Sequence, residues 1–135
     1  MTAGYSGTPL TRKLGIKAGH RVLVDLAPSG FLLVGPEVDA AQVDSKPVRR
    51  EYDVALVFCA DRATLERRWP TVAPRMTTAG ALWIAWPKKS SGVATDLTEN
   101  VVRDTALARG LVDVKVCAVD DTWSGLKLVR RLADR

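Results

Sequence analysis

The stretch between residues 81 and 128 constrains the fold most, because each change of structure within it is marked by a residue that favours that change. An apolar run over 81–86 ends at Pro87, and a central strand cannot spare the backbone donor that proline lacks. The sequence Asp96-Leu-Thr-Glu99 has the form of a capping box, which predicts that a helix begins at Asp96. Gly110 suits the left-handed conformation in which helices commonly end. This part of the chain therefore reads as a buried strand, a basic turn and a helix.

A hairpin is expected after this helix. Residues 111–119 and 126–131 both read as strands, and a polar turn over 120–125 separates them. A connection this short joins antiparallel strands, so we expect only the last strand to run against the others.

Two earlier apolar runs, over 21–27 and 53–59, have the same character as residues 81–86. Their near-continuous apolar composition is typical of strands buried on both faces, as in a parallel sheet covered by helices. The order of strands and helices therefore predicts a three-layer, Rossmann-like α/β fold with a mostly parallel sheet and one antiparallel C-terminal strand. We expect one domain over residues 1–135, with 1–9 as an N-terminal tail or clasp.

The connections between these strands are less clearly marked. Asp61 is expected to cap a helix that Pro70 and Pro74 divide into two short ones, with Met76 on its apolar face and Gly80 at its end. Shorter elements are expected elsewhere: a helix over 10–16, the start of a helix over 31–34, and an edge strand beginning at 42–43.

Composition excludes several classes of function. The chain has 135 residues, of which 47% are apolar and 26% charged, and it has no apolar run long enough to span a bilayer and no apolar signal segment. We therefore expect a cytoplasmic protein with no membrane partner. Two cysteines, Cys59 and Cys117, lie in apolar runs, and His20 is the one histidine, so neither a zinc site nor a serine–histidine nucleophile is expected.

The expected directions of the strands place a candidate site at one edge of the sheet. The C-terminal ends of parallel strands share an edge, and ligands of open α/β sheets bind there. The turns expected at that edge contain the residues that look least like packing: Pro28, Ser29, Gly30, Trp86, Lys88, Lys89, Ser90, Ser91, Gly92, Asp120, Asp121 and Trp123. Lys88 to Gly92 offers two cations, two hydroxyls and a permissive glycine before a helix, a pattern that suits an anion.

Each of these residues also has a structural reading. The lysines fit a solvated surface, Trp86 fits the core, and Trp123 fits packing over the end of the sheet. Asp120 and Asp121 fit a polar turn, although a general base or a metal ligand remains an alternative for them.

The order of elements from residue 53 onward, with the closing hairpin, resembles the C-terminal half of class I S-adenosylmethionine-dependent methyltransferases. Motifs such as Trp86-Pro-Lys-Lys89, Gly110-Leu-Val-Asp-Val-Lys-Val-Cys117 and Thr122-Trp-Ser-Gly-Leu-Lys127 resemble a small bacterial family of uncharacterised proteins with a shortened form of that fold. The resemblance implies a cofactor turn at Asp25-Leu-Ala-Pro-Ser-Gly30, which holds one glycine here, and a ribose-binding acid at Glu37 or Asp44.

The leading hypothesis is a non-enzymatic module that binds a small anionic ligand or a protein partner at this edge. We expect no cofactor bound in the family's usual way, because Pro28 stands where a glycine would let the backbone approach it. A divergent enzyme that uses S-adenosylmethionine or a nucleotide is the alternative. Nucleic-acid binding ranks last, because basic and aromatic residues are not interleaved, although the net charge is +5.

Overall fold

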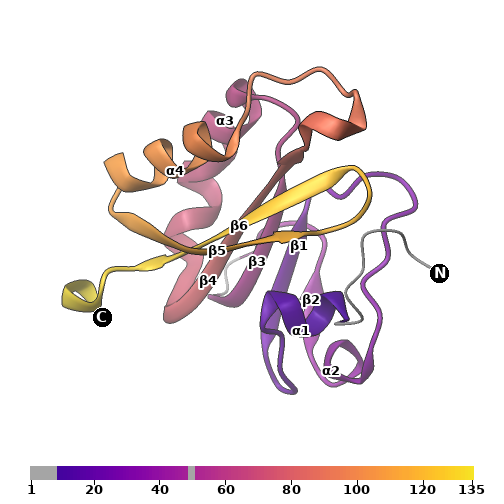
Figure 1. Cartoon of the computed structure of the whole chain (residues 1–135). Helices are drawn as coiled ribbons and strands as arrows, with labels where there is room; N and C mark the ends of the chain where they lie inside the picture. Colours follow the sequence, from indigo (N-terminus) through magenta and orange to yellow (C-terminus); the bar gives the residue numbers. More distant parts are fainter. Residues whose placement is uncertain (1–8, 49–50) are drawn as a thin grey trace.

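The protein contains one six-stranded sheet with helices on both faces (Figure 1), as a computed structural model that describes residues 9–48 and 51–135 shows. The strands follow the chain as β1 Arg21–Asp25, β2 Gln42–Asp44, β3 Tyr52–Phe58, β4 Met76–Pro87, β5 Leu111–Ala118 and β6 Trp123–Arg130. Their order across the sheet is β2-β1-β3-β4-β6-β5.

Strand directions confirm the predicted fold class. Strands β2, β1, β3 and β4 pair in parallel, and β6 pairs antiparallel with both β4 and β5. Because β6 is inserted between β4 and β5, those two strands point the same way. The exits from β1, β3, β4 and β5 therefore lie at one edge, as the sequence predicted.

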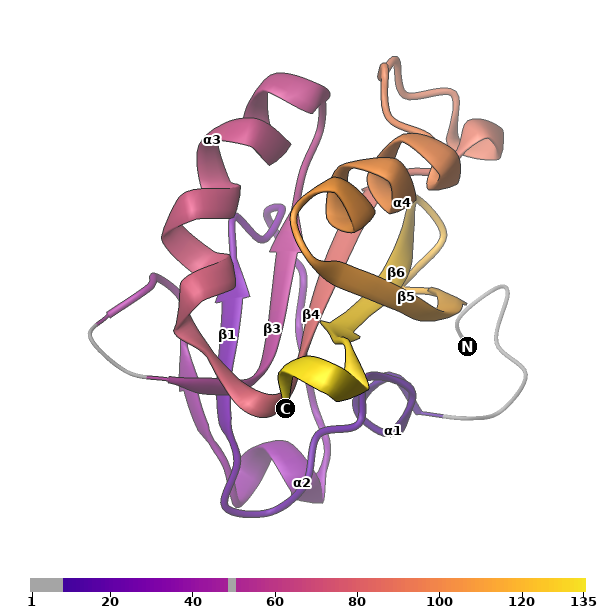
Figure 2. The same ribbon diagram turned by 90° about the vertical axis from the view of Figure 1, so that its left-hand side faces the viewer.

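The helices form two unequal layers. The helices are α1 Leu10–Leu14, α2 Pro36–Asp39, α3 Arg62–Val72 and α4 Glu99–Ala108. Three-residue 3-10 turns lie at Ala73–Arg75, Lys89–Ser91 and Leu132–Asp134. Figure 2 shows α3 and α4 side by side in front of the sheet, whereas the short α1 lies behind it. None of the helices in the described part of the chain is long and apolar enough to cross a membrane.

Alternate residues of the central strands fill the two cores. In β4, Leu82, Ile84 and Trp86 pack on the side of α3 and α4. Ala81, Trp83 and Ala85 pack with α1 on the other side. The indole Nε1 of Trp83 donates to the carbonyl of Leu14 over 3.1 Å, which ties α1 to the sheet. This period of two is the reason that the run could be recognised as a strand.

The prediction of a helix starting at 31–34 was wrong. Phe31 and Leu33 are partly buried, whereas Leu32 and Val34 are 77% and 71% exposed, so the segment alternates like an extended chain. The helix here begins only at Pro36, and the predicted edge strand at 42–43 is confirmed as β2.

The predictions for Pro70, Met76 and Gly80 were also wrong, whereas α3 does end before Pro74. Helix α3 runs through Pro70, because Pro70 is exposed and the helix is held by Leu65, Trp69 and Val72 on its buried side. Met76 begins β4 instead of closing a helix. Gly80 lies in that strand at a register shift, where a Cβ atom would come within 2.9 Å of the Tyr52 carbonyl oxygen.

The predicted capping box at Asp96 does not form. Thr98 is the N-cap of α4, and its hydroxyl accepts from the Val101 amide over 3.2 Å. Asp96 instead accepts from the Arg62 amide over 2.8 Å, at the first turn of α3. Asp61 caps the same helix through the Thr64 amide, as predicted. The two carboxylates thus serve one helix, a pairing that only the tertiary fold creates.

Candidate functional site

Backbone hydrogen bonds join the turns at the C-terminal edge of the sheet. The Lys88 amide donates to the Thr122 carbonyl over 2.8 Å, which fastens the exit from β4 to the turn between β5 and β6. The Thr95 hydroxyl donates to the Ala60 carbonyl over 2.7 Å, which fastens the same loop to the exit from β3. Three of the four predicted turns therefore share one rim.

Side chains in the β5–β6 turn complete this rim. The Lys88 ammonium donates to the Asp120 carbonyl over 3.0 Å. Asp120 Oδ1 accepts from the amides of Thr122 and Trp123, each over 2.8 Å. The Asp120 carboxylate is thus engaged in forming the turn, whereas Asp121 is exposed.

A hollow of about 480 Å³ lies between the loop after β4 and the beginning of α4. We call it the Lys88–Lys89 hollow; its walls include Trp86, Lys88, Lys89, Gly92, Thr98 and Glu99. Lys89 is exposed, and Lys88 is partly buried. The first turn of an α-helix presents backbone N–H groups that have no partner within the helix, so the wall formed by α4 favours negative charge.

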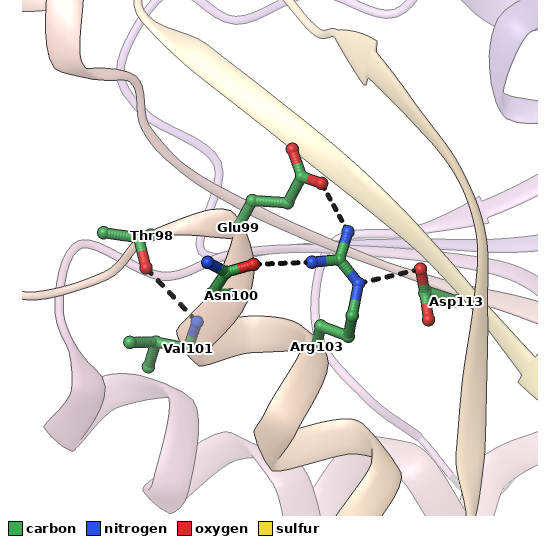
Figure 3. A network of polar contacts seen from close by, with 6 residues as sticks. All are labelled: Thr98, Glu99, Asn100, Val101, Arg103 and Asp113. Atoms are coloured by element: carbon green, nitrogen blue, oxygen red, sulfur yellow. Dashed lines mark hydrogen bonds and ion pairs between the residues drawn. The ribbon is translucent and has the colours of Figure 1, made fainter.

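The one carboxylate in this wall is balanced by an arginine. Glu99 forms an ion pair with Arg103, one turn further along α4, as the i, i+4 spacing predicts (Figure 3). Arg103 also donates to Asn100 over 2.8 Å and to Asp113 over 2.9 Å. Its hydrogen bond to Asp113 lowers the pKa of that carboxyl below its usual value. Glu99 therefore does not cancel the charge of the two lysines.

Two predicted site residues, Ser90 and Ser91, do not border the hollow. The Ser91 hydroxyl donates to the Lys88 carbonyl over 2.7 Å and accepts from the Val93 amide over 3.1 Å. Ser90 is exposed on the 3-10 turn. Gly92 has a φ of 76°, so a residue with a side chain would be strained there.

The aromatic residues at this edge pack together. Trp123 is the first residue of β6, not a turn residue as predicted, and its ring meets the Phe58 ring edge-on at 5.1 Å between centroids. The Phe31 ring also meets the Phe58 ring, at 4.9 Å between centroids. Sequence reasoning missed Phe31 and Phe58 as residues of this edge, because their approach depends on the irregular path of residues 26–35. Trp86 is buried in the core and only borders the hollow.

The turn after β1 lies apart from the lysines. Pro28, Ser29 and Gly30 form a turn closed by the hydrogen bond from the Phe31 amide to the Pro28 carbonyl, of 3.1 Å, and none of the three borders the Lys88–Lys89 hollow. A second hollow, of about 410 Å³, lies beside them. We call it the Asp44 hollow; its walls include Val24, Ala27, Phe31, Leu33, Val43 and Asp44.

The two acids suggested for a ribose occupy different places. Asp44 ends β2 and accepts a hydrogen bond of 2.6 Å from the Tyr52 hydroxyl. Glu37 accepts from the Thr11 hydroxyl and pairs with Arg12, so it fastens α2 to α1. Only Asp44 borders a hollow next to the ends of β1 and β2.

A buried ion pair stands where β1 ends. The Asp25 side chain is 3% exposed, and Arg68 of α3 donates to it over 2.8 Å. Sequence reasoning placed Asp25 in the strand but did not identify its partner, which lies 43 residues further along the chain. In the described residues, no group of three His, Cys, Asp or Glu side chains is placed to hold a metal ion.

Comparison with solved structures identifies the fold. A glycopeptide N-methyltransferase matches 90% of this chain over 87% of its own length, with a TM-score of 0.62 and 8% sequence identity. The ribosomal protein L11 methylase of Lactobacillus delbrueckii subsp. bulgaricus matches 90% of this chain over 75% of its own length, with a TM-score of 0.57 and 11% sequence identity. The magnesium protoporphyrin IX methyltransferase of Synechocystis PCC 6803, solved with bound SAH, matches 90% of this chain over 78% of its own length, with a TM-score of 0.57 and 11% sequence identity.

No protein-family model matches the chain, and no curated protein matches it in sequence. The structural matches therefore define a class by fold: a shortened, Rossmann-like fold of the class I S-adenosylmethionine-dependent methyltransferase type. At these identities they carry no further conclusion about activity.

Proposed function

We propose that this chain is a binding module that holds a small anionic molecule in the Lys88–Lys89 hollow. The observation that carries the proposal is the placement of two cations and the first turn of α4 around one space of about 480 Å³. That volume is within the range of small-molecule sites. An anion there would receive charge-assisted hydrogen bonds, which are among the stronger polar contacts in proteins.

Binding is favoured over catalysis by the state of the reactive side chains. Burial raises the pKa of the Cys59 thiol to about 12, so this cysteine is not a thiolate nucleophile at neutral pH. His20 lies before β1, at the opposite edge of the sheet, where its Nδ1 accepts from the Lys17 amide over 3.1 Å. Asp120 is engaged by two backbone amides. The hollow therefore has groups that bind an anion and lacks an activated nucleophile among the described residues.

The double substitution Lys88→Gln and Lys89→Gln tests this site. Glutamine at residue 88 still offers a donor to the Asp120 carbonyl, so the fold should persist while both charges are removed. Isothermal titration with inorganic pyrophosphate and with adenosine monophosphate is expected to show at least roughly tenfold weaker binding of the bound probe. Loss of one charge-assisted hydrogen bond alone accounts for about 1.5–3 kcal/mol.

The matched control removes two cations elsewhere, by Lys46→Gln and Arg67→Gln. Both residues are exposed and neither borders the Lys88–Lys89 hollow. The control should bind the probe as the wild type does. Equal affinities in all three proteins, or no binding of either probe by the wild type, would exclude the Lys88–Lys89 hollow as the site.

A divergent S-adenosylmethionine-binding protein is the second candidate, and Asp44 favours it. A carboxylate at the end of β2, beside a largely apolar hollow, is the arrangement that the methyltransferase resemblance implies for the cofactor ribose. The matched structures include two solved with SAH.

Calorimetry with S-adenosylmethionine tests this second candidate. If the cofactor binds in the Asp44 hollow, we expect micromolar affinity that weakens roughly tenfold in Asp44→Asn, because a hydrogen bond to a charged acceptor is lost. The Lys88→Gln and Lys89→Gln variant should then bind the cofactor normally. Absence of heat up to millimolar cofactor would exclude this candidate and leave the first untouched.

A further inference from the structure

A third hollow lies at the opposite edge of the sheet from the two hollows at the C-terminal edge, on the face covered by α1. Its volume is about 520 Å³, and we call it the Lys127 hollow. Leu14 and Gly15, at the end of α1, form one wall. Val54, Ala81 and Val129 contribute apolar surface, and Lys17, Lys127 and Arg135 contribute positive charge.

Two lysines face each other across the neighbouring strands. Lys115 of β5 is the direct register partner of Lys127 of β6. Partners in an antiparallel pair point to the same face, so both side chains lie on the face covered by α1, next to Val129 in its core. Like charges directly opposite each other destabilise a sheet. The folded protein therefore contains an unfavourable interaction between Lys115 and Lys127 that packing of the core does not require.

A third lysine adds to this repulsion. Lys17, in the turn after α1, borders the same hollow. The pKa of Lys127 lies below its usual value, chiefly because the side chain is partly buried and further because Lys115 and Lys17 are near. The wall also contains the carboxylate of Asp53, which accepts from the Arg21 amide over 2.8 Å. Across residues 9–48 and 51–135, no acceptor lies within hydrogen-bonding distance of these three ammonium groups.

We propose that the Lys127 hollow is a second anion site, which binds a polyphosphate group through Lys17, Lys115 and Lys127. Lys17, Lys127 and Arg135 line the hollow, and Lys115 stands beside it as the register partner of Lys127. Together they supply more donors and charge than a single carboxylate would need, whereas a diphosphate offers several oxygens and at least two negative charges. Such a ligand would relieve the repulsion between Lys115 and Lys127. The apolar wall allows the polyphosphate to be free or to be carried by a nucleoside.

Thermal unfolding and isothermal titration with inorganic pyrophosphate and with adenosine diphosphate test this site. In the wild type, at least one probe should bind with submillimolar affinity and raise Tm. In the Lys88→Gln and Lys89→Gln background, which removes the first anion site, adding Lys115→Gln and Lys127→Gln should weaken binding of that probe at least roughly tenfold. Without ligand the same two added substitutions should raise Tm by about 1–4 °C, because the facing charges are gone. If Lys115 and Lys127 were only solvated surface residues, replacing them would not both raise Tm and weaken binding of the probe.

Two controls separate this site from the others. The Lys46→Gln and Arg67→Gln variant should show neither effect, and the Lys88→Gln and Lys89→Gln variant should still bind the probe at the Lys127 hollow. Lys17→Gln changes an exposed turn residue and should weaken binding without affecting the sheet. Equal affinity for both probes would assign the site to polyphosphate alone, and tighter binding of adenosine diphosphate would assign it to a nucleotide. Binding of neither probe, or binding insensitive to all three lysines, would overturn the proposal.

Discussion

Replacing Arg68 with methionine is expected to lower the free energy of unfolding by about 3–5 kcal/mol at neutral pH, the cost of leaving a buried charge without its partner. Asp25 is 3% exposed, and Arg68 donates to it over 2.8 Å. Methionine keeps much of the apolar stem that packs on the sheet, so the loss should come from the carboxylate and not from a cavity.

Urea unfolding of four proteins measures this effect. The wild type, Arg68→Met, Asp25→Asn and the double variant form a double-mutant cycle. The double variant should recover much of the stability, because it leaves no buried charge without its partner. A loss below 1 kcal/mol in Arg68→Met would contradict the burial of this pair. Arg67→Met, on the exposed side of α3, is the matched control and should change stability little.

This pair also bears on the cofactor question. Asp25 ends β1, immediately before the turn where the resemblance places a cofactor-binding loop. Its carboxylate is held by α3, so it anchors the strand end in the core. The Asp44 hollow then remains the place where a cofactor would meet a half-buried acid. If S-adenosylmethionine binds, we therefore expect Asp44, and not Asp25, to govern its affinity.

The sheet was predictable because its signals are local. The apolar runs at 53–59 and 81–86 have strand-like composition and are bounded by residues that end strands. Parallel order followed from the alternation of strands with helices, and the hairpin from a short connection. These inferences need only nearest neighbours along the chain, and the directions of β3, β4, β5 and β6 confirm them.

The errors occurred where tertiary contacts decide. A proline in a sequence disfavours a helix, but at Pro70 the packing of Trp69 and Leu65 on the sheet outweighs the lost hydrogen bond. Asp96 has the right spacing for a capping box, yet it caps a helix more than thirty residues earlier. Gly80 was read as the end of a helix, whereas the close approach of the Tyr52 carbonyl is what requires a glycine there.

The candidate sites divide in the same way. Lys88 and Lys89 were recognisable because two cations follow a strand end directly. The repulsion between Lys115 and Lys127 was not, since it depends on the cross-strand register and on a shift between residues 113 and 115. The ring contacts among Phe31, Phe58 and Trp123 were not recognisable either, because the three residues come from separate segments of the chain. A sequence reveals groups that are close along the chain, whereas these clusters form across it.

Raising the pH above 9 is expected to destabilise the wild type more steeply than a Cys59→Ala variant, because folding holds Cys59 as a neutral thiol. Burial, with the nearby charges of Asp25 and Asp61 adding to it, raises the pKa of this thiol from 9.0 to about 12. The raised value means that the unfolded chain loses the proton first. The contribution to stability is therefore complete below pH 9 and is lost as the pH rises toward 12, by about 1.4 kcal/mol for each pH unit.

Urea unfolding at intervals between pH 8 and pH 10.5 measures the difference. Cys59→Ala should be less stable than the wild type at pH 8, because alanine leaves a small cavity, but the two proteins should converge as the pH rises. Cys117, whose pKa burial also raises, is present in both proteins, so its contribution cancels. A constant difference across this range would show that Cys59 ionises in the folded protein as readily as in the unfolded chain. That result would contradict the burial of the Cys59 thiol, on which the argument against a cysteine nucleophile rests.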